Sequence, residues 1–191
     1  MEKTLGQTES DCLRIVLFGP ESTGKTTLAK ELAAHFKTEW VPEFMRPYLQ
    51  EKWDATRTSC ERKDLLPIAH GQMQSENEAA ARANDFLFCD TNLLELKVYS
   101  EFYYDGYCPP EIAEYALKNT YTLYFLTYID VPWEPDDLRD NPNDRFTMFC
   151  TFEDELKRLN LPYQVLKGDR EARFQTALTT LHELKKGLNA Q

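Results

Sequence analysis

The stretch GPESTGKTT (residues 19–27) fits the pattern G-x-x-x-x-G-K-[ST] and limits the possible folds more than any other feature of the chain. It follows the apolar run RIVLF (14–18), which is typical of a buried β-strand. It precedes LAKELAAHF, in which Leu28, Leu32 and Phe36 recur at helical spacing. A strand, a glycine-rich turn and a helix in this order indicate a phosphate-binding loop. The alternative, a loop that only joins strand to helix, agrees less well with the combination of motif and context.

The spacing within this loop has a chemical reason. Gly19 and Gly24 allow the chain to curl, so that backbone N–H groups point toward a bound anion. Lys25 is placed to reach the β- and γ-phosphate oxygens of a nucleoside triphosphate, and the Thr26 hydroxyl is placed to bind Mg²⁺. Mg²⁺ is therefore the expected cofactor. The residues expected to bind ATP are Gly19, Glu21, Ser22, Thr23, Gly24, Lys25, Thr26 and Thr27.

Length and composition predict one domain. The chain has 191 residues, of which 42% are hydrophobic, and this is enough for a sizeable core. We expect a polar N-terminal tail over residues 1–13, without the features of a signal peptide, and a single domain over 14–191. The five cysteines are scattered without a CxxC pair, which favours reduced thiols in a cytoplasmic protein. The net charge of −10 argues against nucleic acid or an anionic membrane as a partner.

Short apolar runs predict four further strands, at 38–44, 86–91, 122–129 and 163–167, the first of them short and broken by Pro42. Helices are expected between them, at 46–53, 63–84, 93–104, 110–118 and 146–160, with a last helix capped by Asp169. Alternating strands and helices predict an α/β fold, a doubly wound parallel sheet of about five strands with helices on both faces. The carboxyl ends of parallel strands share one edge of the sheet, which brings Gly19, Glu43 and Asp90 together.

Two carboxylates are candidates for catalysis. Asp90 ends the run FLFCD, where it is placed to hold Mg²⁺ or to accept a proton from an attacking hydroxyl group. Its alternative role is to cap the following helix. Glu43 follows the second strand and is a candidate general base for an acceptor hydroxyl, or it pairs with Arg46 one turn later. Asp90 and Glu43 are therefore alternative candidates for the general base.

A polar segment rich in proline and aspartate follows the fourth strand, at 130–145. Arg139 and Arg145 in this segment are expected to form a lid over the triphosphate and to neutralise charge on the transferred phosphoryl group. In the alternative interpretation they pair on the surface with the aspartates nearby, Asp136, Asp137, Asp140 and Asp144. Trp133 is either an anchor for the hinge of this lid or a core residue.

Aromatic residues flank these polar positions, namely Trp40, Phe44, Tyr48, Tyr103 and Tyr104. Most aromatic side chains belong to the core. A flat ring is nevertheless expected to stack between two of them, and a positively charged ring gains a cation–π attraction as well.

Five segments follow one another in the order seen in the ribosylnicotinamide kinase domain of NadR proteins and their stand-alone relatives. They are GPESTGKTTLAKELA, VPEFMRPYL, IAHGQMQSENEAAARAN, FLFCDTNLLELKVYSE and IDVPWEPDDLRDNPNDRF. The chain resembles that domain from Arg14 to about Phe174. The combination of PE-x-x-R, DT and PW-x-x-D-x-x-R-x-x-x-x-x-R is far more specific than the phosphate-binding loop alone.

This resemblance implies a P-loop kinase fold that uses Mg²⁺ and ATP. The implied reaction is phosphorylation of the 5′-hydroxyl of nicotinamide riboside to nicotinamide mononucleotide, a step of pyridine nucleotide salvage. By position, Lys25 and Thr26 match the phosphate and Mg²⁺ residues, and Asp90 matches the acid of the DT motif. The lid arginines match Arg139 and Arg145, and the residues that line the riboside match Glu43, Arg46 and Tyr48.

The chain departs from the NadR pattern in two respects. It carries no HxGH-type nucleotidyltransferase motif, so we do not expect the adenylylating function of full-length NadR proteins. NadR proteins place a tryptophan just before the glutamate, whereas this chain has Pro42 there and Trp40 two positions earlier, which makes Trp40 a candidate for ring stacking. The alternatives to a riboside kinase are a kinase of another nucleoside or nucleotide and an NTP-dependent switch or binding module. The sequence lacks both the N-K-x-D of GTPases and the LSGGQ of transport ATPases. The expected arginine lid and the acidic acceptor side favour phosphoryl transfer over a switch.

Overall fold

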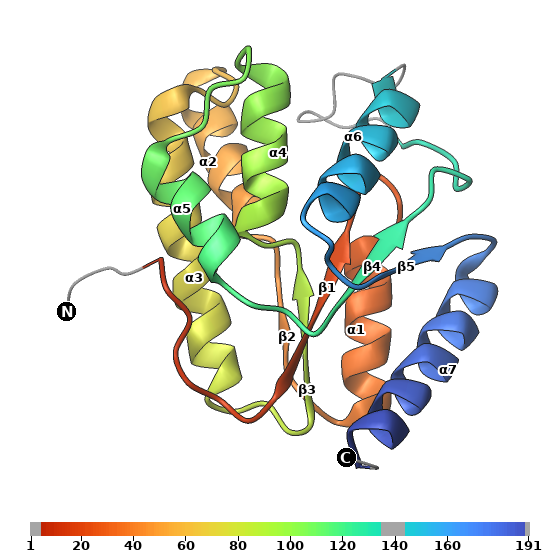
Figure 1. The fold of residues 1–191 in the computed structure, drawn as a ribbon. Helices are drawn as coiled ribbons and strands as arrows, with labels where there is room; N and C mark the ends of the chain where they lie inside the picture. Colours follow the sequence, from red (N-terminus) through yellow and green to blue (C-terminus); the bar gives the residue numbers. More distant parts are fainter. Residues whose placement is uncertain (1–4, 135–143, 190–191) are drawn as a thin grey trace.

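Five parallel strands form the centre of the computed structural model, which describes residues 5–134 and 144–189 (Figure 1). The strands are β1 (Leu13–Phe18), β2 (Trp40–Val41), β3 (Phe86–Asp90), β4 (Leu123–Thr127) and β5 (Tyr163–Leu166). Their order in the sheet is β2-β3-β1-β4-β5. The predicted doubly wound parallel sheet is therefore confirmed. From β1 the chain crosses to the edge strand β2, returns to β3 beside β1, and then passes to β4 and β5 on the other side of β1. This change of side creates a crevice at the carboxyl end of β1.

Helices cover both faces of the sheet. They are α1 (Lys25–Phe36), α2 (Met45–Thr56), α3 (Leu65–Ala80), α4 (Leu93–Tyr103), α5 (Pro110–Lys118), α6 (Arg145–Arg158) and α7 (Arg170–Asn189), and a 3₁₀ turn, η1 (Arg62–Asp64), precedes α3. Helices α1 and α7 pack on one face, and α3, α4, α5 and α6 pack on the other (Figure 1). Within the described ranges, every helix is too short or too polar to span a lipid bilayer.

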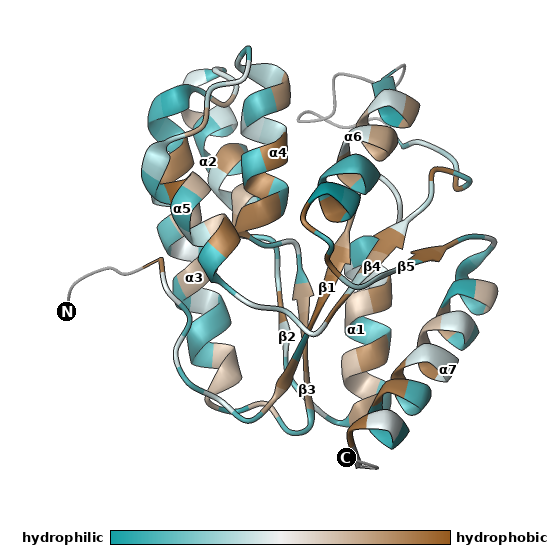
Figure 2. Cartoon of the chain, viewed as in Figure 1, coloured by the Kyte–Doolittle hydropathy of each residue, from teal (hydrophilic) through white to brown (hydrophobic). Residues whose placement is uncertain are grey.

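The strands of the sheet are hydrophobic on both faces because helices cover both. Ile15 and Leu17 of β1 face α1 and α7, while Val16 and Phe18 face the opposite layer. Figure 2 shows hydrophobic residues concentrated along the central strands and hydrophilic ones on the surrounding helices.

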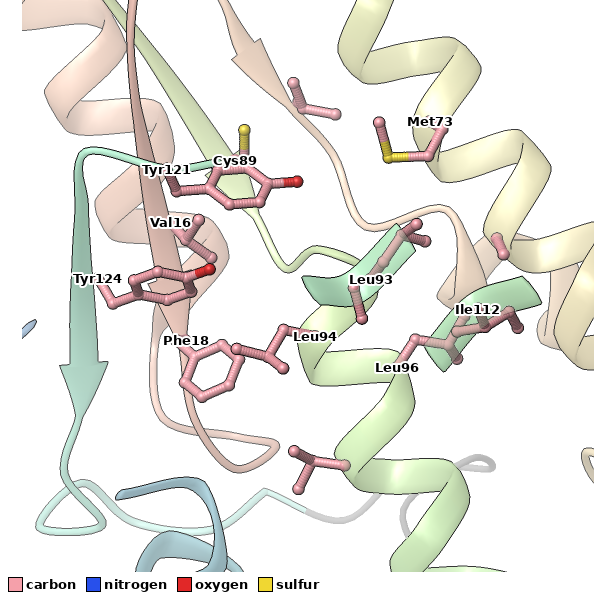
Figure 3. Close-up of a cluster of buried hydrophobic side chains, with 14 of the residues drawn as sticks. Val16, Phe18, Met73, Cys89, Leu93, Leu94, Leu96, Ile112, Tyr121 and Tyr124 are labelled. Atoms are coloured by element: carbon pink, nitrogen blue, oxygen red, sulfur yellow. The ribbon is translucent and has the colours of Figure 1, made fainter. Parts of the chain in front are cut away.

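The larger of the two hydrophobic clusters lies between the sheet and the layer of α3, α4, α5 and α6. Figure 3 shows Val16, Phe18 and Tyr124 beside Leu94 of that helix. The Phe18 and Tyr124 rings meet edge to face, with their centroids 5.3 Å apart, and Phe18 meets Phe152 of α6 in the same way. This packing fixes α4 and α6 on the carboxyl end of β1, where Phe18 directly precedes the phosphate-binding loop.

Several elements differ from their predicted bounds, β2 and α3 among them. Strand β2 covers only Trp40–Val41 instead of 38–44, because Pro42 has no N–H to donate to a neighbouring strand. The helix expected over 63–84 begins as η1 and ends at Ala80 as α3. Its proline, Pro67, lies in the first turn, as the sequence predicts.

The segment expected to be a polar tail packs against the domain from Leu5 onward. Leu5 is fully buried, and its carbonyl accepts a hydrogen bond from Asn119. The Gln7 side chain donates to Glu76, which also accepts from the Tyr121 hydroxyl and lies 3.3 Å from Arg14 Nε. A buried carboxylate in α3 thus ties this segment to the sheet.

Candidate active site

The phosphate-binding loop (residues 19–27) lies at the carboxyl end of β1 and leads into α1. Its backbone passes through positive φ at Gly19, Ser22 and Gly24. A Cβ on Gly19 would come within 3.0 Å of the carbonyl oxygen of Thr127, so the close approach of β4 requires glycine there. The hydroxyl groups of Thr23 and Thr127 share a hydrogen bond of 2.7 Å, which joins the loop to β4.

Lys25 is buried and its ammonium group is held by the protein itself. Its Nζ donates to the carbonyl oxygens of Gly19 at 2.6 Å and of Pro20 at 3.0 Å. It also lies 3.2 Å from Glu95 Oε1. Burial alone would lower the pKa of Lys25, but the neighbouring carboxylates, Glu95 first, raise it above its usual value. The lysine is therefore charged, as phosphate binding requires.

Thr26 and Asp90 are joined directly. The Thr26 hydroxyl donates to Asp90 Oδ2 at 2.5 Å. Asp90 Oδ1 is buried and has no hydrogen-bond partner in the part of the chain that the structure describes. The alternative role of Asp90 as a helix cap is wrong, because Asn92 caps α4 by accepting a hydrogen bond from the N–H of Glu95. A hydroxyl group beside a carboxylate with an unsatisfied oxygen is the donor set that Mg²⁺ prefers.

Glu43 faces the same cavity as the phosphate-binding loop. Desolvation raises the pKa of its carboxyl group, and the positive charge of Lys25 is the largest opposing influence. Arg46 lowers the pKa less than Lys25 does, so pairing with Arg46 does not dominate the environment of Glu43. Asp90 adds a repulsive contribution. A carboxylate with a raised pKa that faces a cavity fits the requirements of a general base.

One cavity of about 780 Å³ extends from the phosphate-binding loop between α2 and α4. It is large enough for a nucleotide and a second small molecule. Its polar end is formed by Glu21, Ser22, Thr23, Gly24, Lys25, Thr26 and Thr27, together with Glu43, Arg46 and Glu95. Its other end is largely apolar and aromatic, with Met45, Leu49, Trp53, Leu65, Leu96, Tyr99, Tyr103 and Tyr104 among the lining residues.

The structure brings some of the expected aromatic residues to this cavity and not others. Tyr103 and Tyr104 line it, and the Tyr103 ring stacks against Tyr99 with centroids 6.1 Å apart. Trp40 lies outside it, packed with the cluster of α1 and α7, where Lys30 sits 5.1 Å from its ring. Tyr48 is also outside the cavity lining, because its hydroxyl group donates to Asp64 at 3.2 Å.

The beginning of the predicted lid lies over the phosphate-binding loop. Trp133 Nε1 donates to Glu21 at 3.4 Å, and the N–H of Glu134 donates to the Ser22 hydroxyl at 3.1 Å. Arg145, the first residue of α6, donates to the carbonyl oxygens of Ser22 and Val131. Arg139 falls outside the described residues.

Arg173 of α7 contacts the backbone of the phosphate-binding loop. Its guanidinium group donates to the carbonyl oxygens of Thr23 at 2.5 Å, Tyr128 at 2.8 Å and Gly168 at 2.9 Å, and it forms an ion pair with Asp130. The side chain is almost fully buried. One residue thus fixes the loop, the end of β4 and the turn before α7 relative to each other.

Sequence reasoning missed Glu95. This residue is the third of α4, and its carboxylate accepts a hydrogen bond from Gly19 N–H at 3.3 Å and lies beside Lys25. An acid three residues after an Asn cap is usually read as a solvent-facing capping residue. The only available signal was its position in the first turn of a helix that begins at the phosphate-binding edge of the sheet.

Comparison with known proteins identifies the domain. Residues 14–173 match a protein family described as an AAA domain, which is most of the chain. The chain belongs to this family. It is also similar to the trifunctional NAD biosynthesis/regulator protein NadR of Salmonella typhimurium, with 26% identity over 173 residues, and to that of Escherichia coli K12, with 25%. The match covers 89% of this chain but only 42% of each relative. The predicted resemblance to NadR is confirmed.

Solved structures agree with this assignment of fold. A NadR protein in complex with NR aligns with a TM-score of 0.67 and 18% identity, over 91% of this AAA-domain chain and 52% of the other. A deoxyadenosine kinase from M. mycoides aligns with a TM-score of 0.66 and 15% identity, over 90% of this chain and 100% of the other. The domain therefore has the α/β fold of P-loop kinases.

Proposed function

We propose that this chain is an ATP-dependent kinase that phosphorylates the 5′-hydroxyl of a nucleoside, and that nicotinamide riboside is the favoured acceptor. The products are then nicotinamide mononucleotide and ADP. The observation that carries this proposal is a single cavity lined both by the phosphate-binding loop and by Glu43. Donor phosphates and an acceptor hydroxyl group held in one cavity need no large motion to react.

The phosphate-binding loop and its helix are proposed to hold the triphosphate. Backbone N–H groups of the loop and the N-terminal end of α1 attract the phosphate oxygens. Lys25 adds a positive charge at the β- and γ-phosphates. Arg145 begins α6, and its guanidinium group donates to the carbonyl oxygen of Ser22 in the loop. It is therefore the proposed cation that stabilises the charge of the transferred group.

Mg²⁺ is proposed to bind between Thr26 and Asp90. The fit rests on the Thr26–Asp90 hydrogen bond and on the buried Asp90 oxygen that lacks a partner within the described residues. When bound, Mg²⁺ neutralises charge on the β- and γ-phosphate oxygens.

Glu43 is proposed as the general base. The acceptor hydroxyl oxygen forms a bond to the γ-phosphorus, while the bond from that phosphorus to the β–γ bridging oxygen breaks and ADP leaves. The hydroxyl proton passes to the Glu43 carboxylate. Asp90 is less suitable as the base because it lies outside the cavity lining and is bonded to Thr26.

The acceptor end of the cavity suits a positively charged aromatic ring. Tyr99, Tyr103, Tyr104 and Trp53 line this end, and Glu43 lies at the polar end of the same cavity. The nicotinamide ring of the riboside is such a cation, and it would gain cation–π attraction from these rings. The relatedness to NadR, one structure of which is a complex with NR, supports the same acceptor.

A second acceptor class is favoured by a different observation. The structurally similar deoxyadenosine kinase aligns over its whole length, whereas the NadR structures align over about half of theirs. A neutral purine or pyrimidine deoxynucleoside is therefore the next candidate, since the same aromatic side chains stack with any flat base.

The test is to incubate the purified chain with Mg-ATP and a panel of nucleosides and to identify products by mass spectrometry. The panel contains nicotinamide riboside, deoxyadenosine, deoxycytidine, adenosine and an acceptor-free control. We expect nicotinamide mononucleotide to appear together with ADP. Phosphorylation of another nucleoside alone would reassign the acceptor. ATP loss that is independent of every acceptor would contradict the kinase proposal and favour an NTP-dependent switch.

A further inference from the structure

Glu95 occupies an unusual position for an acid at the start of a helix. It is the third residue of α4, and its backbone N–H donates to the Asn92 cap. In a capping box the carboxylate would turn back to the N–H of the cap residue. Here it turns toward the phosphate-binding loop instead, and the side chain is 3% exposed.

Both oxygens of Glu95 contact groups that a nucleotide would use. Oε2 accepts a hydrogen bond from Gly19 N–H at 3.3 Å, and Oε1 lies 3.2 Å from Lys25 Nζ. Lys25 also donates to two loop carbonyl oxygens, so its ammonium group is fully engaged without any ligand. The carboxylate thus contacts the lysine and an N–H group of the loop that would otherwise be available to an anion.

We propose that Glu95 is a positioning residue of the phosphate-binding loop. In the empty site its carboxylate holds Lys25 and the N–H of Gly19, and it competes with the nucleotide for both groups. This inference rests on the proposed function only in requiring that the loop binds a nucleotide. A phosphate and an ionised carboxylate that share one lysine in a buried site repel each other strongly. Nucleotide binding is therefore easiest when Glu95 is neutral.

The surroundings of Glu95 decide its charge. Lys25 faces it from α1, Glu43 from the segment after β2, and Asp90 from the end of β3. On α4 itself, Tyr99 lies close enough for its own pKa to respond to the charge of Glu95. Burial raises the pKa of Glu95 to about 8, and Lys25 is the largest influence in the opposite direction.

Nucleotide binding should shift the protonation of Glu95. When a nucleotide engages Lys25, Glu95 loses its main favourable partner and gains a negative neighbour, so its pKa rises further. The bound state then holds more protons than the empty state at pH values above about 8. Affinity for nucleotide should fall as the pH rises through this range, by up to about tenfold per pH unit.

The test uses Mg-ADP, which needs no acceptor, and titration calorimetry between about pH 7 and about pH 9.5. In the wild type we expect weaker binding toward high pH and proton uptake, measured by comparing buffers of different ionisation enthalpy. Glu95→Gln keeps the shape and the hydrogen bond to Gly19 but cannot ionise. We expect it to bind Mg-ADP about tenfold more tightly than the wild type at the upper end of the range, with no proton uptake.

A matched control lies on the same helix. Glu101 pairs with Lys97 and does not line the cavity, so Glu101→Gln should retain the pH dependence of the wild type. Two results would overturn the inference: weaker Mg-ADP binding by Glu95→Gln than by the wild type at every pH, or Mg-ADP binding by the wild-type protein without proton uptake. A chain that shows the expected Mg-ADP binding but phosphorylates no nucleoside would contradict the proposed function and leave the role of Glu95 standing.

Discussion

Thr26 and Asp90 lie 64 residues apart in the sequence and share a hydrogen bond of 2.5 Å between the Thr26 hydroxyl and Asp90 Oδ2. This bond joins the first turn of α1 to the last residue of β3. It exists because β1 and β3 are adjacent and in a register that sets Leu17 opposite Asp90. The strand pairing thus builds the proposed metal site.

Asp90→Asn should weaken the use of Mg²⁺ without unfolding the domain. The amide keeps a hydrogen-bond acceptor for Thr26 but removes the negative charge. We expect a loss of about 10- to 100-fold in activity at a fixed low Mg²⁺ concentration, partly restored by more Mg²⁺. A Mg²⁺ titration of the kinase rate measures this. Asp85→Asn, an exposed acid just before the same strand, is the control, and equal Mg²⁺ curves for the two variants would contradict the assignment.

Glu43→Gln should remove general-base catalysis, lowering kcat by about 10²- to 10⁴-fold with a smaller effect on ATP affinity. In the wild type the base must be ionised, and the pKa of Glu43 is raised above its usual value. The rate should therefore fall as the pH decreases through this raised pKa, and the residual rate of the variant should lack that acid limb. A pH–rate profile provides the measurement, with Glu51→Gln of α2 as the control. An unchanged rate in Glu43→Gln would move the role of base to another carboxylate.

Gly71→Ala should displace the segment that carries Glu43. A Cβ on Gly71 of α3 would lie 2.2 Å from Cε1 of Phe44, which follows Glu43 in the chain. The N–H of Phe44 donates to the Gln72 side chain of the same helix. We expect a loss of about 1–3 kcal/mol in the free energy of unfolding. We also expect a lower kcat, and Phe44→Leu in the same chain should relieve part of both effects.

Gly187→Ala is the matched control for this substitution. Gly187 also lies in a helix, but a Cβ there would have nothing within 4 Å. Alanine should therefore leave the domain as stable as the wild type or more stable by up to about 1 kcal/mol. Urea unfolding compares the two variants, and a Gly71→Ala domain as stable as Gly187→Ala would show that the packing against Phe44 is loose.

Arg173→Ala should release the phosphate-binding loop from its support. The substitution leaves the Thr23 and Tyr128 carbonyl oxygens and Asp130 without their shared donor. A loss of about 3–5 kcal/mol in the free energy of unfolding and weaker nucleotide binding are expected. Arg170, on the same helix as Arg173, forms an exposed ion pair with Glu31 of α1, and Arg170→Ala should cost at most about 1 kcal/mol. Similar losses in both variants, measured by thermal unfolding, would argue against a supporting role for Arg173.

The sequence predicted the features that depend on local pattern. The glycine-rich turn between β1 and α1, the strand that ends in Asp90 and the helix that begins at Pro110 are confirmed because motif and hydrophobic spacing act over a few residues. The strand order was not predicted, since pairing joins segments far apart in the chain. The bond between Thr26 and Asp90 therefore became visible only in the fold.

The remaining differences concern which way a side chain faces. Trp40 was expected near the acceptor ring, yet in a two-residue strand it alternates with Val41 and packs toward α1 and α7. Tyr48 was expected to line the riboside, but its hydroxyl group donates to Asp64, the last residue of η1. The groups that Trp40 and Tyr48 contact lie on other elements of the chain. Short strands and side-chain partners on other elements leave no periodic signal.

The most direct test of the central claim is a phosphoryl balance with nicotinamide riboside, in which ADP and nicotinamide mononucleotide are quantified from the same reaction for the wild type and for Lys25→Ala. The account predicts that the wild type forms the two products in equal amounts. It predicts that Lys25→Ala, although folded by circular dichroism, forms neither. Equal turnover by the lysine variant, or ADP formed without any phosphorylated acceptor, would contradict the claim that this loop and Glu43 form one phosphoryl-transfer site.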